Sequence, residues 1–182
     1  MTAARLPGDP TPDELAQRAI RVDHAGEAGA VRIYEGQLAI LGRTRAGASL
    51  RAMKAKEESH RDELARLIRE RSVRPTALSP LWDIAGFALG AATALLGAKA
   101  AMAATVAIED VIEEHYKNQE TALAAAGTEP ELTALVARFG ADETAHKEEA
   151  LAHGAREAPA YELLTAAIKT GSRIAIWLST RI

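Results

Sequence analysis

Two short segments of this chain place a histidine three residues after a glutamate. Residues 57–60 read Glu-Glu-Ser-His, and residues 143–146 read Glu-Thr-Ala-His. Residues three apart on an α-helix lie on the same face, so each pair can direct a carboxylate oxygen and an imidazole nitrogen to one point. Such a pair suits a metal ion. One pair alone is weak evidence, because most glutamates on helices are simply solvated.

Each motif has a further glutamate at the matching height of the preceding helix. Residue 42, midway between Glu27 and Glu57, falls in a turn predicted at residues 42–47. Residue 126, midway between Glu109 and Glu143, likewise falls in a turn predicted at residues 124–128. The pattern Glu…Glu-x-x-His therefore occurs twice, which is the ligand set of a di-iron or di-manganese four-helix bundle. The predicted metal ligands are Glu27, Glu57, His60, Glu109, Glu143 and His146.

The other histidines and one tyrosine fit this set less well. His24 is close to the first predicted ligand, but the symmetric set is complete without it, so we interpret it as a neighbour of the site or an exposed residue. His115 comes six residues after Glu109, which is about 600° around the helix, so we expect its side chain to point away from the predicted metal site. We expect His153 to cap a helix or lie at the surface. Tyr116 either lines the approach of a substrate or belongs to the core.

The composition restricts the remaining chemistry. The chain has 182 residues, no cysteine, and 22 basic against 25 acidic side chains, with a formal net charge of −3. The lack of cysteine excludes disulfides, thiolate-bound zinc, iron–sulfur clusters and a cysteine nucleophile. The near balance of charge gives no electrostatic case for a nucleic-acid partner. The length suits one domain, which we expect to span residues 1–182.

Signals for helix ends define the first hairpin. Residues 11–14 (Thr-Pro-Asp-Glu) predict a capped helix start, and we expect residues 1–11 to be disordered. The first helix then extends to the turn at residues 42–47. A second helix runs from about residue 48 to residue 71 and stops before Pro75, because the residue preceding a proline is pushed out of helical geometry.

The second hairpin and the last helix have similar signals. Residues 128–131 (Thr-Glu-Pro-Glu) predict another capping box, at the start of the helix that carries the second motif. A last, amphipathic helix is expected over residues 161–177, and Trp177 suits it to a membrane interface. No useful length of the chain alternates with a period of two, so the fold class is all-α.

The connection between the hairpins contains extra residues. In a symmetric bundle the two predicted ligands Glu57 and Glu109 would lie equally far from the connection. Glu57 is 18 residues from Pro75, whereas Glu109 is 29 residues from Pro80, and we assign the excess to residues 81–97. The uncharged run over residues 84–98 is shorter than the ~20 residues needed to cross a bilayer. Two interpretations stay open: a buried core helix, or an apolar segment that dips into one leaflet and admits a lipid-like substrate.

Several segments resemble a known family. They are residues 20–27 (Ile-Arg-Val-Asp-His-Ala-Gly-Glu), 80–82 with 86–90, 93–97 (Thr-Ala-Leu-Leu-Gly) and 158–161 (Ala-Pro-Ala-Tyr). Together they closely resemble the demethoxyubiquinone hydroxylases of ubiquinone biosynthesis, and the resemblance covers the chain from residue 20 to its end. On the family pattern, the iron ligands are the same six residues that spacing selects.

The resemblance implies a ferritin-like di-iron monooxygenase that hydroxylates the ring of a demethoxyubiquinol. It implies two iron ions per chain, dioxygen as co-substrate and NADH as reductant, although no dinucleotide-binding glycine motif locates an NADH site. The expected partners are a polyprenyl quinol, the membrane surface, and a lipid-presenting accessory protein or further copies of the chain. Since no signal or transit peptide is evident, we expect a bacterial protein, peripheral on the cytoplasmic side of the cell membrane.

Two other functions would use the same features. A ferritin-like iron oxidase or storage protein needs the six ligands but neither an organic substrate nor an apolar crossover segment. A non-enzymatic helical module requires the mirrored motifs to be accidental. Metal content and membrane binding separate these alternatives.

Overall fold

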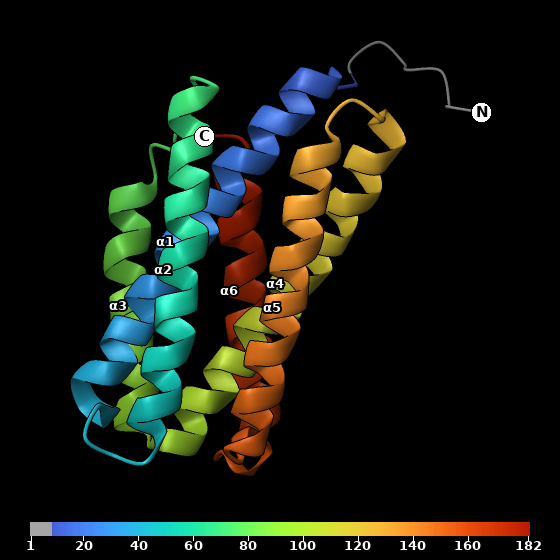
Figure 1. The fold of residues 1–182 in the computed structure, drawn as a ribbon. Coiled ribbons are helices and arrows are strands. Elements are labelled where there is room, and N and C mark those ends of the chain that lie inside the picture. Colours follow the sequence, from blue (N-terminus) through green and yellow to red (C-terminus); the bar gives the residue numbers. More distant parts are fainter. Residues whose placement is uncertain (1–8) are drawn as a thin grey trace.

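The computed structural model describes residues 9–182, and no strand occurs among them, which confirms the all-α prediction. The helices are α1 (Pro12–Leu41), α2 (Ala46–Glu70), α3 (Ser79–Leu95), α4 (Ala98–Ala126), α5 (Pro130–Ala152) and α6 (Tyr161–Ser179), with a short 3-10 turn at Ala155–Glu157 (Figure 1). The predicted disorder of residues 1–11 falls mostly outside the described residues.

Two antiparallel hairpins, α1–α2 and α4–α5, form the bundle (Figure 1). The predicted start of α1 is confirmed, because Thr11 Oγ1 accepts from the backbone N–H of Glu14 at 3.1 Å and the Glu14 carboxylate accepts from the N–H of Thr11 at 2.7 Å. The first turn follows Leu41. Gly127 ends α4 with a φ of 69°, a left-handed conformation that suits glycine.

The predicted capping box at residues 128–131 is wrong. The residue that precedes α5 is Glu129, and no side chain caps this helix. Thr128 lies one position too early, because the chain is still leaving the left-handed turn at Gly127. Pro130 occupies the first helical position, where the missing N–H of proline costs nothing.

The crossover helix α3 lies against α1 at unusually short distance. A Cβ atom built on Gly36 would lie 2.2 Å from the carbonyl oxygen of Phe87, and one built on Gly90 would lie 2.0 Å from the carbonyl oxygen of Ile33. Only glycine allows this approach of the two backbones. The small-residue face of α3 is therefore inward, and its larger side chains turn outward.

The outward face of α3 is apolar. Ile84 and Leu95 are each 72% exposed, and Leu163 on α6 is 73% exposed. The interpretation of residues 81–97 as a buried core helix is therefore wrong, because only the glycine-rich face of this segment is covered. In the described part of the chain, every helix is too short or too polar to cross a membrane.

Helix α4 runs through the centre of the molecule and contacts α1, α3, α5 and α6. The small side chains of its first half allow this, since residues 100–104 are 0–1% exposed and four of them are alanines. Ion pairs hold α6 to α4, for example Lys169 Nζ to Asp110 Oδ2 at 2.7 Å. The six predicted metal ligands come from α1, α2, α4 and α5 and lie between the two hairpins.

Candidate metal centre

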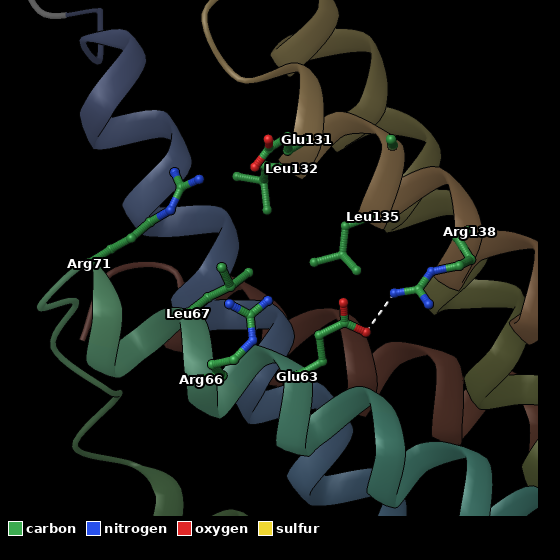
Figure 2. A pocket seen from close by; sticks show the side chains of 9 residues that line it. Glu63, Arg66, Leu67, Arg71, Glu131, Leu132, Leu135 and Arg138 are labelled. Carbon is green, nitrogen blue, oxygen red and sulfur yellow. Dashed lines mark hydrogen bonds and ion pairs between the residues drawn. The ribbon is translucent and has the colours of Figure 1, made fainter.

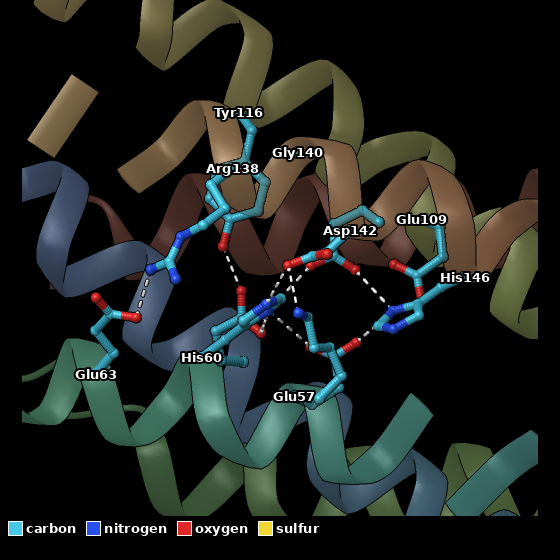
Figure 3. A network of polar contacts seen from close by, with 12 residues as sticks. Glu57, His60, Glu63, Glu109, Tyr116, Arg138, Gly140, Asp142 and His146 are labelled. Atoms are coloured by element: carbon cyan, nitrogen blue, oxygen red, sulfur yellow. Dashed lines mark hydrogen bonds and ion pairs between the residues drawn. The ribbon is translucent and has the colours of Figure 1, made fainter. Parts of the chain in front are cut away.

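Four helices converge on one buried group of carboxylates and imidazoles (Figure 3). The carboxylate residues are 1–2% exposed, and the two histidines are 3% and 7% exposed. All six residues that the sequence singles out are brought together here: Glu27 from α1, Glu57 and His60 from α2, Glu109 from α4, and Glu143 and His146 from α5. The i, i+3 spacing works as expected, because each motif glutamate and its histidine share one helix face.

The six side chains form two overlapping groups of four, and within each group the ligand-capable atoms lie within 4.8 Å of one another. One group, called here the His60 position, consists of Glu27, Glu57, His60 and Glu143. The other, the His146 position, consists of Glu57, Glu109, Glu143 and His146. Because Glu57 and Glu143 belong to both groups, their carboxylates can serve two neighbouring cations.

Both histidines direct Nδ1 at this interior. His146 Nδ1 lies 2.8 Å from Glu57 Oε1 and 3.2 Å from Glu143 Oε2. His60 Nδ1 lies 3.4 Å from Glu143 Oε1 and 3.6 Å from Glu27 Oε2. In the neutral tautomer protonated on Nε2, each imidazole therefore offers its Nδ1 lone pair to the point where the carboxylates meet.

Several buried atoms of the cluster lack a hydrogen-bond partner of acceptable geometry. They are Glu57 Oε1, His60 Nδ1, Glu109 Oε2 and Glu143 Oε1. A buried polar atom without a partner costs about 1–3 kcal/mol, and folded proteins retain few of them. Four of the seven such side-chain atoms among the described residues thus belong to predicted ligands. Oxygen and imidazole lone pairs that face one interior fit a divalent cation such as iron or manganese.

The electrostatics of the side chains agree with this fit. Burial raises the pKa of Glu57 well above its usual value, and repulsion from its carboxylate neighbours adds to the effect. Burial and repulsion from Glu143 do the same to the pKa of Glu109. Burial alone would lower the pKa of His60, but the surrounding carboxylates outweigh it and raise this pKa to about 12. The metal-free site therefore holds protons on side chains that would be deprotonated as metal ligands, and bound cations would take the place of those protons.

Two buried tyrosines hold the glutamates that stand alone on their helices. Tyr116 is 2% exposed and donates its hydroxyl to Glu27, which places it in the buried interior. Tyr34 donates to Glu109 Oε1 at 3.0 Å. Each tyrosine lies seven residues beyond the glutamate of its own helix and bonds to the glutamate of the other helix. Tyr34 was not predicted, although the repeated spacing of glutamate and tyrosine on both helices is a signal that could have found it.

His115 points away from the carboxylate cluster, as predicted, and contacts a buried acid. Its Nε2 lies 3.1 Å from Asp23 Oδ1, and the Gln119 amide donates to the same oxygen at 2.8 Å. Burial raises the pKa of Asp23, and these two contacts offset the rise only in part. Asp23 was not predicted, because one aspartate within a helix carries no sequence signal of burial.

The other two histidines also lie outside both positions. His24 is half-buried, and burial lowers its pKa. His153 Nε2 lies 2.9 Å from Ser49 Oγ, near the surface where α2 and α5 meet. A further residue missed by the sequence reasoning is Asp142, whose Oδ2 lies 3.0 Å from His60 Nε2.

Two cavities lie near these helices. The larger, of about 380 Å³, is at the surface between α2 and α5 (Figure 2). Arginine and glutamate side chains surround its leucine floor, and none of the six predicted ligands lines it. The smaller is too narrow for a water molecule, but it reaches Glu109 and Tyr34 between α1 and α4, beside Ile33 and Ile108.

Comparison with known proteins identifies relatives over almost the whole chain. Residues 14–179 match the family described as "Ubiquinone biosynthesis protein COQ7". The chain is 53% identical over 179 residues to the "3-demethoxyubiquinol 3-hydroxylase" of Rhodospirillum rubrum, which covers 98% of this chain and 84% of the relative. It is 48% identical over 167 residues to the human "NADPH-dependent 3-demethoxyubiquinone 3-hydroxylase, mitochondrial". That alignment covers 91% of this chain and 77% of the human protein. These matches confirm the resemblance found in the sequence. The chain therefore belongs to the COQ7 family of ubiquinone biosynthesis proteins.

Proposed function

We propose that this chain is a di-iron monooxygenase that hydroxylates the ring of a demethoxyubiquinol in ubiquinone biosynthesis. The observation that carries the proposal is the buried cluster in which unpaired carboxylate and imidazole atoms converge from four helices. The names of its relatives, which act on demethoxyubiquinol or demethoxyubiquinone, support the substrate.

The two groups of four side chains would hold one iron ion each. Their oxygen-rich composition, with one imidazole for each ion, suits iron. When bound, the pair of ions supplies the redox chemistry with dioxygen that amino-acid side chains lack. The protein holds the carboxylates in place through Tyr34 and Tyr116, whose hydroxyls donate to Glu109 and Glu27. Phe139, which is 1% exposed, stacks on His60 and keeps water from that side of the site.

The narrow cavity beside Glu109 supports an entrance for the quinol ring between α1 and α4. Its apolar walls include Ala30, Ile33 and Ile108. The gap is too narrow for a water molecule, so a ring would pass only if the side chains of Ile33 and Ile108 moved aside. The substrate could then reach the cluster without opening the charged ends of the bundle.

The exposed apolar faces of α3 and α6 support a peripheral position on the membrane that contains the quinone. Large apolar side chains at an accessible surface mark a contact with lipid or with a protein. The proposed partners are the polyprenyl quinol and the inner face of a bacterial cell membrane. A lipid-presenting accessory protein, or a second copy of the chain, would cover the part of this surface that lipid leaves open.

An oxygen-labelling assay tests the proposal. The purified chain is reconstituted with ferrous iron, mixed with demethoxyubiquinol in lipid vesicles, and exposed to ¹⁸O₂ in the presence of NADH or NADPH. The resemblance implies NADH as reductant, whereas several relatives are named as NADPH-dependent, so both reductants are compared. The expected result is a quinol that gains one labelled oxygen atom. Iron that is oxidised and retained without any labelled product would instead indicate a storage protein.

A further inference from the structure

The metal centre has an internal repeat that relates its two halves. Residues of α1 correspond to residues of α4 that come 82 positions later, and residues of α2 correspond to residues of α5 that come 86 positions later. The corresponding pairs are Glu27 and Glu109, Tyr34 and Tyr116, Gln37 and Gln119, Glu57 and Glu143, and His60 and His146. Immediately before the motif glutamates, however, the repeat fails, because α2 has Lys56 where α5 has Asp142.

Asp142 fixes the imidazole of His60. Its Oδ2 lies 3.0 Å from His60 Nε2, on the side of the ring opposite the inward Nδ1. The ring also stacks on Phe139, with centroids 4.0 Å apart. The same oxygen, Asp142 Oδ2, also lies 3.0 Å from Lys56 Nζ. The carboxylate sets the tautomer and the orientation that metal binding through Nδ1 requires.

His146 has no equivalent support. Its Nδ1 faces Glu57 and Glu143, but among the described residues no acceptor contacts its Nε2. By the repeat, the residue that corresponds to Asp142 is Lys56. A lysine ammonium group has no lone pair and cannot accept a hydrogen bond from His146. Lys56 Nζ instead lies 3.0 Å from Asp142 Oδ2. The lysine at position 56 thus leaves His146 without an acceptor, and its ammonium group contacts the acceptor of His60.

We infer that the two metal positions are unequal: the His60 position binds a divalent cation more tightly and fills first, and Asp142 is a positioning residue that acts through His60. The inference rests on the proposed function, since it requires that the two groups bind metal. Loss of the carboxylate partner of a metal-binding histidine typically weakens metal binding by about 10–100-fold.

Titration of the metal-free full-length chain with cobalt(II), followed by visible absorbance and calorimetry, tests this order. The wild type is expected to bind two ions in two steps with dissociation constants at least about tenfold apart. Asp142→Ala removes the support that distinguishes the two positions, so the dissociation constant of the first step should rise by about tenfold or more until it matches that of the second, which should stay unchanged. Asp142→Asn, which keeps an acceptor oxygen, should recover part of the loss. Circular dichroism checks that each variant is folded.

A matched control separates this role from general destabilisation. Lys56→Ala removes the ion pair with Asp142 but keeps the contact between Asp142 and His60, so the first step should change by less than about threefold, in line with the small effect of an accessible ion pair. Two equal steps in the wild type, or equal weakening of both steps by Asp142→Ala, would overturn the inference and leave the proposed function standing. A chain that binds no cobalt would overturn both.

Discussion

Tyr34 on α1 donates its hydroxyl to Glu109 on α4 at 3.0 Å, and Tyr116 on α4 donates to Glu27 on α1 in return. The exchange is possible because α1 and α4 are antiparallel, so that residue 34 lies level with residue 109 and residue 27 with residue 116. Both bonds cross between the two hairpins. They orient two predicted ligands and at the same time tie one half of the bundle to the other.

Removal of the Tyr34 hydroxyl is expected to impair the metal centre without unfolding the chain. Tyr34→Phe keeps the buried ring but leaves Glu109 without its donor, and a hydrogen bond to a charged group is worth about 1.5–3 kcal/mol. We expect a loss of that order in the free energy of unfolding of the iron-loaded chain, and at least about a tenfold lower hydroxylation rate. Tyr161→Phe on α6, outside the cluster, is the control. A wild-type rate in Tyr34→Phe would contradict this role.

Neutralisation of Glu109 should separate stability from function. Burial and repulsion raise the pKa of Glu109, so its ionised form destabilises the metal-free fold. Glu109→Gln is expected to raise the melting temperature of the metal-free chain, lower its iron content and abolish hydroxylation. His146→Ala should also abolish activity, with helical content near that of the wild type.

Glu114→Gln is the control for these effects on stability and iron content, because Glu114 is exposed and, among the described residues, forms an ion pair with Arg173 alone. It should change the free energy of unfolding by less than about 0.5 kcal/mol and leave iron content unaltered. Hydroxylation at the wild-type rate by a Glu109 variant that retains no iron would rule out the assigned site.

The pH dependence of stability is expected to have opposite signs in the metal-free and metal-loaded chains. Glu57 and Glu109 have pKa values raised above 4.5 in the folded chain, and the pKa of His60 is raised from 6.5 to about 12. Above pH 4.5 the folded chain therefore binds more protons than the unfolded chain, so stability falls as pH rises. Bound metal requires deprotonated ligands, so its contribution grows with pH.

Thermal unfolding between pH 5 and pH 8 measures this difference. The metal-free chain should melt at progressively lower temperature as the pH increases, and the iron- or manganese-loaded chain at progressively higher temperature. Parallel curves for the two forms would show that the metal does not replace protons on these side chains.

A methyl group at Gly90 should displace the crossover helix. A Cβ atom there would lie 2.0 Å from the carbonyl oxygen of Ile33, so Gly90→Ala forces α3 away from α1 and should cost about 1–3 kcal/mol or more. Gly171→Ala on α6 is the matched control, because no atom outside the adjoining backbone of α6 lies within 4 Å of its added methyl group. It should stabilise the chain by up to about 1 kcal/mol through helix propensity. Chemical denaturation of both variants measures the contrast.

Charges on the outward face of α3 should weaken membrane binding without affecting the fold. Ile84→Glu combined with Leu95→Glu places two carboxylates at side chains that are each 72% exposed. We expect at least about tenfold weaker sedimentation with phosphatidylcholine vesicles that contain ubiquinone. Ala124→Glu combined with Ala137→Glu adds the same charge at exposed positions of α4 and α5. If both double variants bind the vesicles equally well, α3 does not contact the lipid surface.

The bundle and the six clustered residues were predictable because they depend on short-range periodicity. The i, i+3 spacing sets a common helix face, and equal distances from a turn set a common height, whatever the details of packing. The resemblance to the family selected the same six residues, and the match to the family model confirmed the resemblance itself. The roles of the six residues as ligands stay predictions.

Contacts that cross between helices were harder to predict. Whether Tyr34 meets Glu109, or Asp142 meets His60, depends on how far each helix is rotated about its axis, and core packing sets that rotation. The orientation of α3 is a similar case. Gly86 and Gly90 share one face of it, but the sequence does not say which helix covers that face. The result is an outward apolar surface rather than a buried helix.

The division of the site between the hairpins has a mechanical consequence. The His60 position takes three side chains from the first hairpin and one from the second, and the His146 position reverses these numbers. Each ion held there would act as a clamp across the interface, a crosslink that can be undone by a chelator or by acid. In a chain without cysteine, the metal centre would thus take over the role that a pair of disulfides has elsewhere.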